Sequence, residues 1–387
     1  MIGSKGFVDR KTMVWHNPIA QDRVKEMLGA AYGANTLGHA YLFCGEEGVG
    51  KFEAAFELAL ALLCSAEGTV PCRACPSCRK ALRNAHPDLH VLTPVSLDKE
   101  HKASDGKLSP AGWDYLTGVV RQRIEVPYVK PQQSGVPSIP VEWIKEVNHA
   151  LLRGPVDGLA SVAIIASVDL MNKESANAML KTLEEPPANT FMILTTSMPQ
   201  SVLPTIASRC QIVRFGLVPS AKIRDAILGA VGLSADPRAV ERAAYYAMGS
   251  VTRGMELVSD NQAEAVAEAR GFLGACGLGD WQEISRRIDA LSRVSDYDAH
   301  ARFFVNCMYL LRNEFLKIEG YSETYIEESE PVSPVRIPAD PGSVEKLCGA
   351  CQKALAAVTA NGNCGITYVN FALTVMELLN VEKQQAG

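Results

Sequence analysis

The chain has 387 residues, which at about 150 residues per domain predicts two to three domains and excludes a single small module. Apolar residues make up 47% and charged residues 21%, proportions typical of a folded globular protein and unlike those of disordered or membrane-spanning chains. The formal net charge of −5 excludes a chain-wide positive field, so we expect any contact with DNA to be local or shared with partners.

Residues 1–17 lack the apolar run of a signal peptide. The best candidate for a membrane span, near residues 52–63, is interrupted by Glu53 and Glu57. The cysteines are odd in number, eleven, and only four of them cluster, which argues against a secreted disulfide framework. We therefore expect a cytoplasmic protein without membrane contact.

Between residues 39 and 215, short apolar runs alternate with helical patterns, as in strand–helix–strand units around a parallel sheet. The runs have four to six residues, which is the length of buried strands. The expected strands are 39–44, 89–92, 162–166, 191–196 and 212–215. Five such strands predict an α/β core of the nucleotide-binding type.

The sequence GEEGVGK, residues 45–51, lies between the first strand and a helix predicted to begin at Phe52, which is the context of a phosphate-binding loop. Gly45, Gly48 and Gly50 allow backbone N–H groups to face an anion at the helix N-terminus, and Lys51 can reach phosphates. The next residue should be Ser or Thr to bind Mg²⁺, but Phe52 has no side-chain oxygen. We predict a degenerate nucleotide loop that does not bind ATP tightly, or a turn that keeps only the shape.

A cluster of four cysteines follows in the spacing C-x7-C-x2-C-x2-C: Cys64, Cys72, Cys75 and Cys78. Four thiolates satisfy a tetrahedral zinc ion at about 2.3 Å. An iron–sulfur cluster is the alternative, because C-x2-C-x2-C with a fourth cysteine can hold one. The basic neighbours Arg73, Arg79 and Lys80 are typical of a surface knuckle, and we predict a Zn²⁺ module over residues 64–80.

The stretch 93–140 is poor in apolar residues and contains two polar runs, 98–102 and 130–135. Compact domains rarely need so many residues without regular structure. We therefore predict an insertion with a long loop.

An active phosphate loop is served by a second strand that ends in acidic residues, which orient Mg²⁺ and the attacking water. The candidate strand 162–166 ends in Ala166 and Ser167 where Asp-Glu is expected, and Asp169 comes two to three positions too late. This loss and the loss at Phe52 affect the same metal ion. The chain is therefore not expected to hydrolyse ATP by itself.

Residues 176–187, ANAMLKTLEEPP, predict a helix with one apolar face that ends at the double proline. After the strand 191–196 comes LPTIASRCQ, residues 203–211, which contains Arg209. An isolated exposed arginine is usually a solvated surface residue, but its neighbours favour a function for Arg209.

Helical periodicity dominates after residue 215. Two or three short helices are expected in 219–258, and longer amphipathic helices in 262–319 and 343–383, separated by the proline-containing segment 327–334. Cys348 and Cys351 lie at i, i+3 on an apolar face without a second pair, so we predict that they pack in a core.

Taken together, these motifs resemble the bacterial clamp-loader branch of the AAA+ family. HAYLFCGEEGVGK, PCRACPSC, the segment His86-Pro87-Asp88, ANAMLKTLEEPP and LPTIASRCQ carry the resemblance, which is dense over residues 16–216. It implies an AAA+ α/β domain over 1–216 with an inserted zinc module, a small helical lid domain over 217–280 and an all-α collar domain over 281–387. In this family, subunits assemble through the collar into a hetero-pentameric ring.

The resemblance also assigns roles to residues. In this family the arginine of Ser-Arg-Cys completes the ATP site of a neighbouring subunit, which makes Arg209 a catalytic residue in trans. The family's sensor residues map to Thr195 or Thr196 and to Thr252, where active members have an arginine, so that Arg253 is displaced by one.

Active gamma and tau subunits keep the metal-binding hydroxyl and the Asp-Glu pair, which this chain lacks. It therefore looks like a non-hydrolysing subunit that supports loading of the sliding clamp onto primer–template DNA, with gamma/tau and delta subunits as partners. A working gamma/tau-type ATPase or an unrelated P-loop enzyme is the alternative, opposed by Phe52 and Ala166. A zinc-dependent adaptor without a role on DNA is a third hypothesis, opposed by Arg209.

Overall fold

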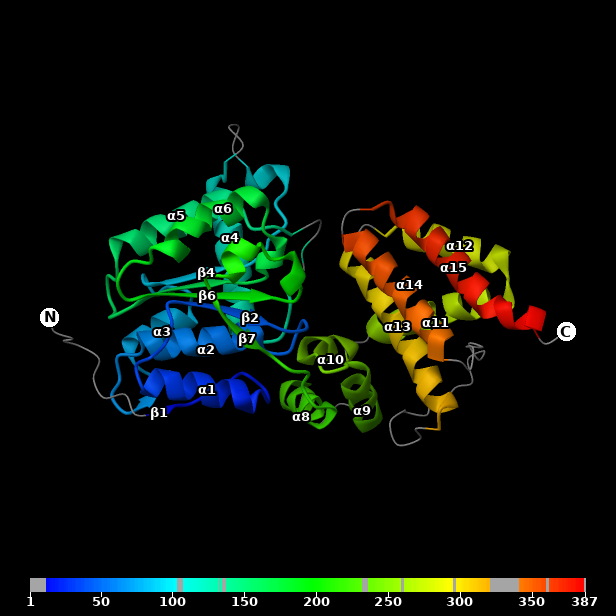
Figure 1. Cartoon of the computed structure of the whole chain (residues 1–387), viewed down its shortest axis with the longest axis horizontal. Helices are drawn as coiled ribbons and strands as arrows, with labels where there is room; N and C mark the ends of the chain where they lie inside the picture. The colour runs from blue at the N-terminus through cyan, green and yellow to red at the C-terminus, as the bar shows by residue number, and fades with distance from the viewer. Residues whose placement is uncertain are drawn as a thin grey trace. The chain divides into compact units, whose positions relative to one another are not determined.

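Figure 1 shows the computed structural model of the chain. It describes residues 12–102, 107–131, 133, 137–231, 236–258, 261–294, 297–320, 341–359 and 362–385. Contacts divide the chain into two compact units, and the first takes in residues 1–133, 137–235 and 247–255. The second takes in residues 134–136, 236–246 and 256–387.

A five-stranded parallel sheet forms the centre of the first unit. In spatial order its strands are β4 (Leu89–Leu92), β5 (Ser161–Ile165), β6 (Thr190–Thr196), β2 (Ala40–Cys44) and β7 (Gln211–Arg214). All five predicted strands are confirmed, each to within one residue at either end. The carboxyl end of β2, flanked by β6 and β7, opens into the glycine-rich loop, as expected of a parallel α/β sheet.

Helices cover both sides of this sheet. In Figure 1, α2 (Lys51–Leu63) lies on one side, whereas α5 (Val141–Arg153) and α6 (Lys173–Glu184) lie on the other. The remaining elements up to α7 are α1 (Asp22–Gly33), α3 (Pro76–Leu82), α4 (Pro110–Glu125), α7 (Pro204–Ala207) and the short parallel pair β1 (Thr12–Met13) and β3 (Thr69–Val70). Three single 3₁₀ turns cover Lys99–His101, Val168–Leu170 and Pro199–Ser201.

Every residue of α2 is buried, including two glutamates. A buried carboxylate is costly unless it is paired, and both are. Glu57 forms an ion pair with Arg73 and lies 3.5 Å from a ring nitrogen of His16, whereas Glu53 accepts a hydrogen bond from the backbone N–H of Tyr128 at 3.1 Å. The helix thus connects the sheet to residues far apart in the sequence.

The prediction of a long loop over residues 93–140 is wrong in its central part, because α4 is a 16-residue helix. Ser109 caps it by accepting a hydrogen bond from the N–H of Gly112, and Pro110 occupies the first turn. Buried apolar residues then recur at helical spacing: Leu116, Val119, Val120 and Ile124. The polarity of the flanking runs hid this pattern.

Three helices follow β7, as expected: α8 (Ser220–Val231), α9 (Pro237–Tyr246) and α10 (Val251–Val258). The predicted longer helices are α11 (Asn261–Leu278), α12 (Trp281–Ser292), α13 (Tyr297–Ile318), α14 (Pro341–Thr359) and α15 (Cys364–Gln385). The predicted break at 327–334 lies outside the described residues.

The core of the second unit is aromatic. Phe272, Phe304 and Tyr368 are fully buried, and the rings of Phe304 and Tyr368 stack with centroids 5.0 Å apart. Cys351 is buried in this core and Cys348 packs against it, which confirms their structural role. Among the described helices, none combines the length and the apolar character needed to cross a membrane.

Candidate functional site

The glycine-rich loop turns sharply between β2 and α2. Gly48 and Gly50 have φ angles of +75° and +99°, a region that favours glycine. A Cβ atom on Gly48 would lie 2.8 Å from Cβ of Thr252, and one on Gly50 would lie 2.8 Å from Oη of Tyr128. The loop conformation and its close neighbours therefore both require these glycines.

Lys51 turns back onto its own loop. Its ammonium group donates hydrogen bonds to the carbonyl oxygens of Gly45 at 2.7 Å and Glu46 at 2.6 Å. Burial lowers the pKa of Lys51, while Glu47, Glu53 and Asp169 oppose that shift. The charge expected to face phosphate is thus satisfied within the loop.

The place where a metal-binding hydroxyl is expected holds the buried ring of Phe52. It stacks on Phe56, with centroids 6.2 Å apart, and the guanidinium carbon of Arg123 lies 4.4 Å from its ring centroid. This is the distance of a cation–π contact.

At the end of β5, Ala166 is fully buried, and the N–H of Ser167 donates to Oγ1 of Thr195 at 3.1 Å. Asp169 accepts a 2.5 Å hydrogen bond from Oγ1 of Thr196. Asp169 is not among the residues that line the hollow beside the glycine-rich loop, in keeping with its position two to three residues after the place where an acidic metal ligand is expected.

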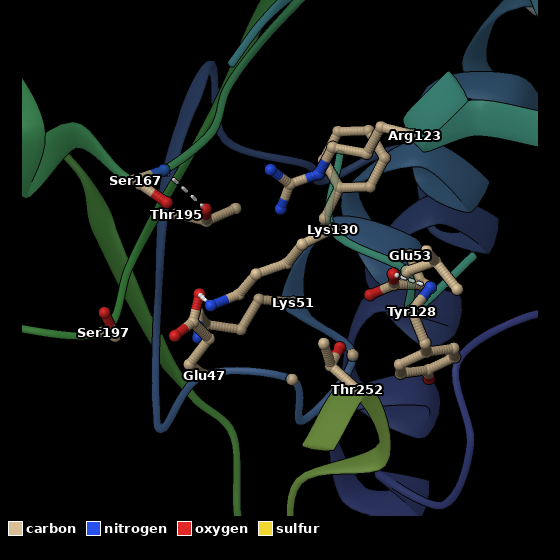
Figure 2. A pocket seen from close by; sticks show the side chains of 14 residues that line it. Glu47, Lys51, Glu53, Arg123, Tyr128, Lys130, Ser167, Thr195, Ser197 and Thr252 are labelled. Carbon is tan, nitrogen blue, oxygen red and sulfur yellow. Dashed lines mark hydrogen bonds and ion pairs between the residues drawn. The ribbon is translucent and has the colours of Figure 1, made fainter. Parts of the chain in front are cut away.

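Figure 2 shows that hollow, which has a volume of about 50 Å³, room for a few water molecules. Its lining comes from the loop and the first turn of α2, from the end of α4 and the segment after it, from the strand ends and from α10. Thr195 lines it, whereas Thr196 bonds Asp169 instead, so Thr195 is the sensor candidate that faces the loop. At α10 the lining residue is Thr252.

Four of the lining residues come from the insertion and were missed by the sequence analysis: Arg123, Tyr128, Val129 and Lys130. Arg123 donates to Oγ1 of Thr93 at 2.8 Å, and Lys130 pairs with Glu47 at 2.7 Å. Burial lowers the pKa of Arg123, and Glu53 and Glu47 oppose that shift. The start signal of α4 could have predicted the helix, but no local pattern indicates that its end reaches the loop.

The four predicted metal ligands come together. The sulfur atoms of Cys64, Cys72, Cys75 and Cys78 all lie within 4.8 Å of one another, and Cys64 Sγ is 3.6 Å from Cys72 Sγ and 3.9 Å from Cys75 Sγ. A tetrahedral zinc ion with bonds of about 2.3 Å requires sulfurs about 3.8 Å apart. A cluster of several irons would need more widely spaced sulfurs, so the set is compatible with one zinc ion.

Backbone groups support this arrangement. The N–H of Cys75 donates to Sγ of Cys72, and the N–H of Cys78 donates to Sγ of Cys75, which also caps α3. Burial opposes ionisation of Cys75, but hydrogen bonds from Ser65 and Cys78 outweigh it and lower its pKa to about 6. These contacts favour the metal-binding thiolate form of Cys75, whereas burial raises the pKa of Cys64 and of Cys78.

Asp88, the acid of the His86-Pro87-Asp88 segment, is structural. It is buried, and its carboxylate accepts hydrogen bonds from the N–H groups of Val156 at 2.6 Å, Asp157 at 2.8 Å and Gly158 at 2.6 Å. Lys80 at the end of α3 pairs with Asp157. This loop therefore links the cysteine module to the start of β5.

Arg209 lies in the turn between α7 and β7. Its guanidinium is held by Glu184 at 2.6 Å and donates to the carbonyl of Thr205 at 2.8 Å, and its side chain is 34% exposed. It is not among the residues that line the hollow of its own loop. The geometry leaves it accessible to another molecule.

Comparison with known proteins places these sites in a family. A family model described as DNA polymerase III, delta subunit, matches residues 20–218. The delta′ subunit of DNA polymerase III from Bacillus subtilis is 29% identical over 208 residues, 54% of this chain and 51% of that protein. The gamma/tau subunit from Mycobacterium bovis is 29% identical over 294 residues, 74% of this chain and 43% of that protein.

The chain thus spans about half the length of the curated delta′ relative that it matches. Among solved structures, a DNA polymerase III gamma subunit-related protein from Thermotoga maritima covers 92% of this chain and 99% of its own, with 14% identity and a TM-score of 0.39. The family match extends over more than half of the chain and includes the loop, the cysteine module and Arg209. The chain therefore belongs to the DNA polymerase III delta-subunit family, with delta′ subunits among its relatives.

Proposed function

We propose that this chain is a non-hydrolysing clamp-loader subunit of the delta′ type, which supports ATP-dependent loading of a sliding clamp onto primed DNA. The observation that carries the proposal is the loss of both expected Mg²⁺ ligands: Phe52 stands in place of a hydroxyl and Ala166 in place of a carboxylate. Phosphoryl transfer depends almost entirely on positioning and charge neutralisation. A loop without these ligands does not support turnover.

The second part of the proposal is that Arg209 acts in trans on the ATP site of a neighbouring subunit. Its partial exposure, and its absence from the residues that line the hollow at its own loop, support this role. A guanidinium at the γ-phosphate neutralises charge in the transition state and can be worth roughly 10³ to 10⁵ in rate.

The assembly proposed is a hetero-pentameric ring with gamma/tau and delta subunits, which contacts the sliding clamp and primer–template DNA in the cytoplasm. Residues 217–280 would form the lid domain and residues 281–387 the collar that holds the ring together. The buried core of the second unit supports a helical collar, and it includes α11 (Asn261–Leu278), so the collar would begin before residue 281. The cysteine module over residues 64–80 would hold Zn²⁺ as a structural ion.

A gamma/tau-type ATPase is the competing function, favoured by the larger share of the chain that matches the gamma/tau relative. It requires Mg²⁺-dependent hydrolysis by the chain alone, lost when Lys51 is replaced. Single-turnover assays of the isolated chain with Mg-ATP distinguish the two functions, and we expect no hydrolysis above background.

The test of the trans role is Arg209→Ala in a reconstituted ring. We expect unchanged folding, metal content and ring assembly, but a lower clamp- and DNA-stimulated ATPase rate. The loss should be smaller than roughly 10³-fold because other ATP sites persist. Arg153→Ala, at an exposed position of the same unit, serves as the control. Rings with Arg209→Ala that load clamps at the wild-type rate across ATP concentrations would show that the assignment is wrong.

A further inference from the structure

The segment at and after the end of α4 covers the loop that the family uses for nucleotide. We propose that residues 123–130 are a built-in plug, which keeps this loop closed and places the guanidinium of Arg123 where a divalent cation would otherwise be needed. This goes beyond the proposed function, which requires only that the chain does not hydrolyse ATP. We call residues 123–130 the plug.

The first support is the position of the positive charge. Arg123 lies over Phe52, the residue that replaces the metal-binding hydroxyl. Figure 2 shows its guanidinium pointing toward Ser167 and Thr195, at the strand ends where acidic metal ligands are absent. A side chain of this chain thus occupies the space between the two lost ligands.

The second support is charge balance. Glu47 and Glu53 both act on Arg123 electrostatically, and Glu47 also pairs with Lys130. Two carboxylates beside a phosphate loop would repel an anion, and a metal ion would ordinarily offset them. Here the plug supplies the compensating cations, so the loop needs no ion.

The third support is steric. The hydroxyl of Tyr128 lies so close to Gly50 that a Cβ atom there would be 2.8 Å from it. The same hydroxyl accepts from the N–H of Ile19 at 2.8 Å and donates to the carbonyl of Asn17 at 3.2 Å. Tyr128 is buried and has a φ of +64°, a conformation that a non-glycine residue keeps only where its surroundings fix it.

An open anion site is the competing interpretation of three cations at one loop. However, Lys51 donates to loop carbonyls, Lys130 pairs with Glu47, and Arg123 bonds Thr93. The volume that remains at the loop, about 50 Å³, is well below that of the clefts that bury a small ligand. The arrangement is that of an occupied site.

The experiment measures binding of a fluorescent ATP analogue, mant-ATP, to the full isolated chain. We expect no saturable binding by the wild type at the highest concentration tested, with or without Mg²⁺. For Arg123→Ala combined with Tyr128→Ala we expect saturable binding at least about tenfold tighter than that limit. That gain should disappear when Lys51→Ala is added. Arg121→Ala, exposed on the same helix, is the matched control and should behave as the wild type.

Tight binding by the wild type, or a folded double variant that binds no better than the wild type, would overturn the proposal. If the double variant does not fold, hydrogen exchange of the wild type decides. Added ATP should leave the exchange of residues 45–51 and 123–130 unchanged, whereas protection of either segment contradicts a plug. Because these readouts use the isolated chain, they can fail while the Arg209 test in the ring succeeds, and the reverse.

Discussion

Glu184 and Arg209 form an ion pair at a partly exposed position, and the carbonyl of Thr205 holds the same guanidinium. The glutamate comes from the motif LEEPP and the arginine from the motif SRC, so the two motifs that the sequence analysis treated separately meet here. The contact holds the guanidinium at this partly exposed position. Glu184 is thus a positioning residue for the proposed role in trans.

We predict that Glu184→Gln lowers the stimulated ATPase rate of the reconstituted ring by about two- to fivefold, because exposed ion pairs contribute up to about 1 kcal/mol. The effect must be smaller than that of Arg209→Ala, and Arg209→Lys should not restore the rate because lysine lacks the planar fork. A variant ring as impaired as Arg209→Ala would indicate that Glu184 has another role.

Phe52 permits a test of whether one lost metal ligand suffices to explain inactivity. Phe52→Thr restores a hydroxyl but removes a buried ring, which should reduce the free energy of unfolding by about 3 kcal/mol, as measured by urea denaturation. We expect no gain of Mg²⁺-dependent hydrolysis in the isolated variant, because Ala166 and Ser167 still lack carboxylates. Turnover by this variant would contradict the interpretation of two independent losses.

At the scale of elements, the cysteine module gathers four cysteine side chains around one candidate metal position. We predict about one zinc per purified chain by elemental analysis, and loss of that zinc in Cys75→Ser with local unfolding of residues 64–80. The sheet should survive because its strands are stabilised by their own buried core. Cys348→Ser, which alters a cysteine outside the cluster, should keep the metal; iron with visible absorbance would contradict the zinc assignment.

The strands were predictable from short apolar runs bounded by glycine, proline and polar residues, which is why β4 matches its prediction from Leu89 to Leu92. The cysteine cluster was predictable because its ligands are close in sequence. The helix α4 was missed because its charged flanks outweighed the apolar spacing from Leu116 to Ile124. Its start at Ser109-Pro110 is a local signal that would have corrected the prediction.

At the scale of the molecule, contacts between distant parts of the chain set the limit of prediction. Arg123 contacts Phe52 although the cysteine module and β4 lie between them in the sequence, and Tyr128 bonds Asn17 more than a hundred residues away. Periodicity reports which residues face a core, but it does not report which segment covers a given loop. The loop itself was therefore predictable, and the residues that cover it were not.

The N-terminal segment 12–19 joins two features that were described separately. Its first residues pair with Thr69 and Val70 inside the cysteine module, His16 contacts Glu57, and its last residues hold the hydroxyl of Tyr128. Because this segment contacts both the cysteine module and Tyr128, we expect binding of the proposed zinc ion to restrain the residues that hold the plug as well. Coupling of this kind is reciprocal, so we then expect any change that favours the closed loop to raise the zinc affinity by the same free energy.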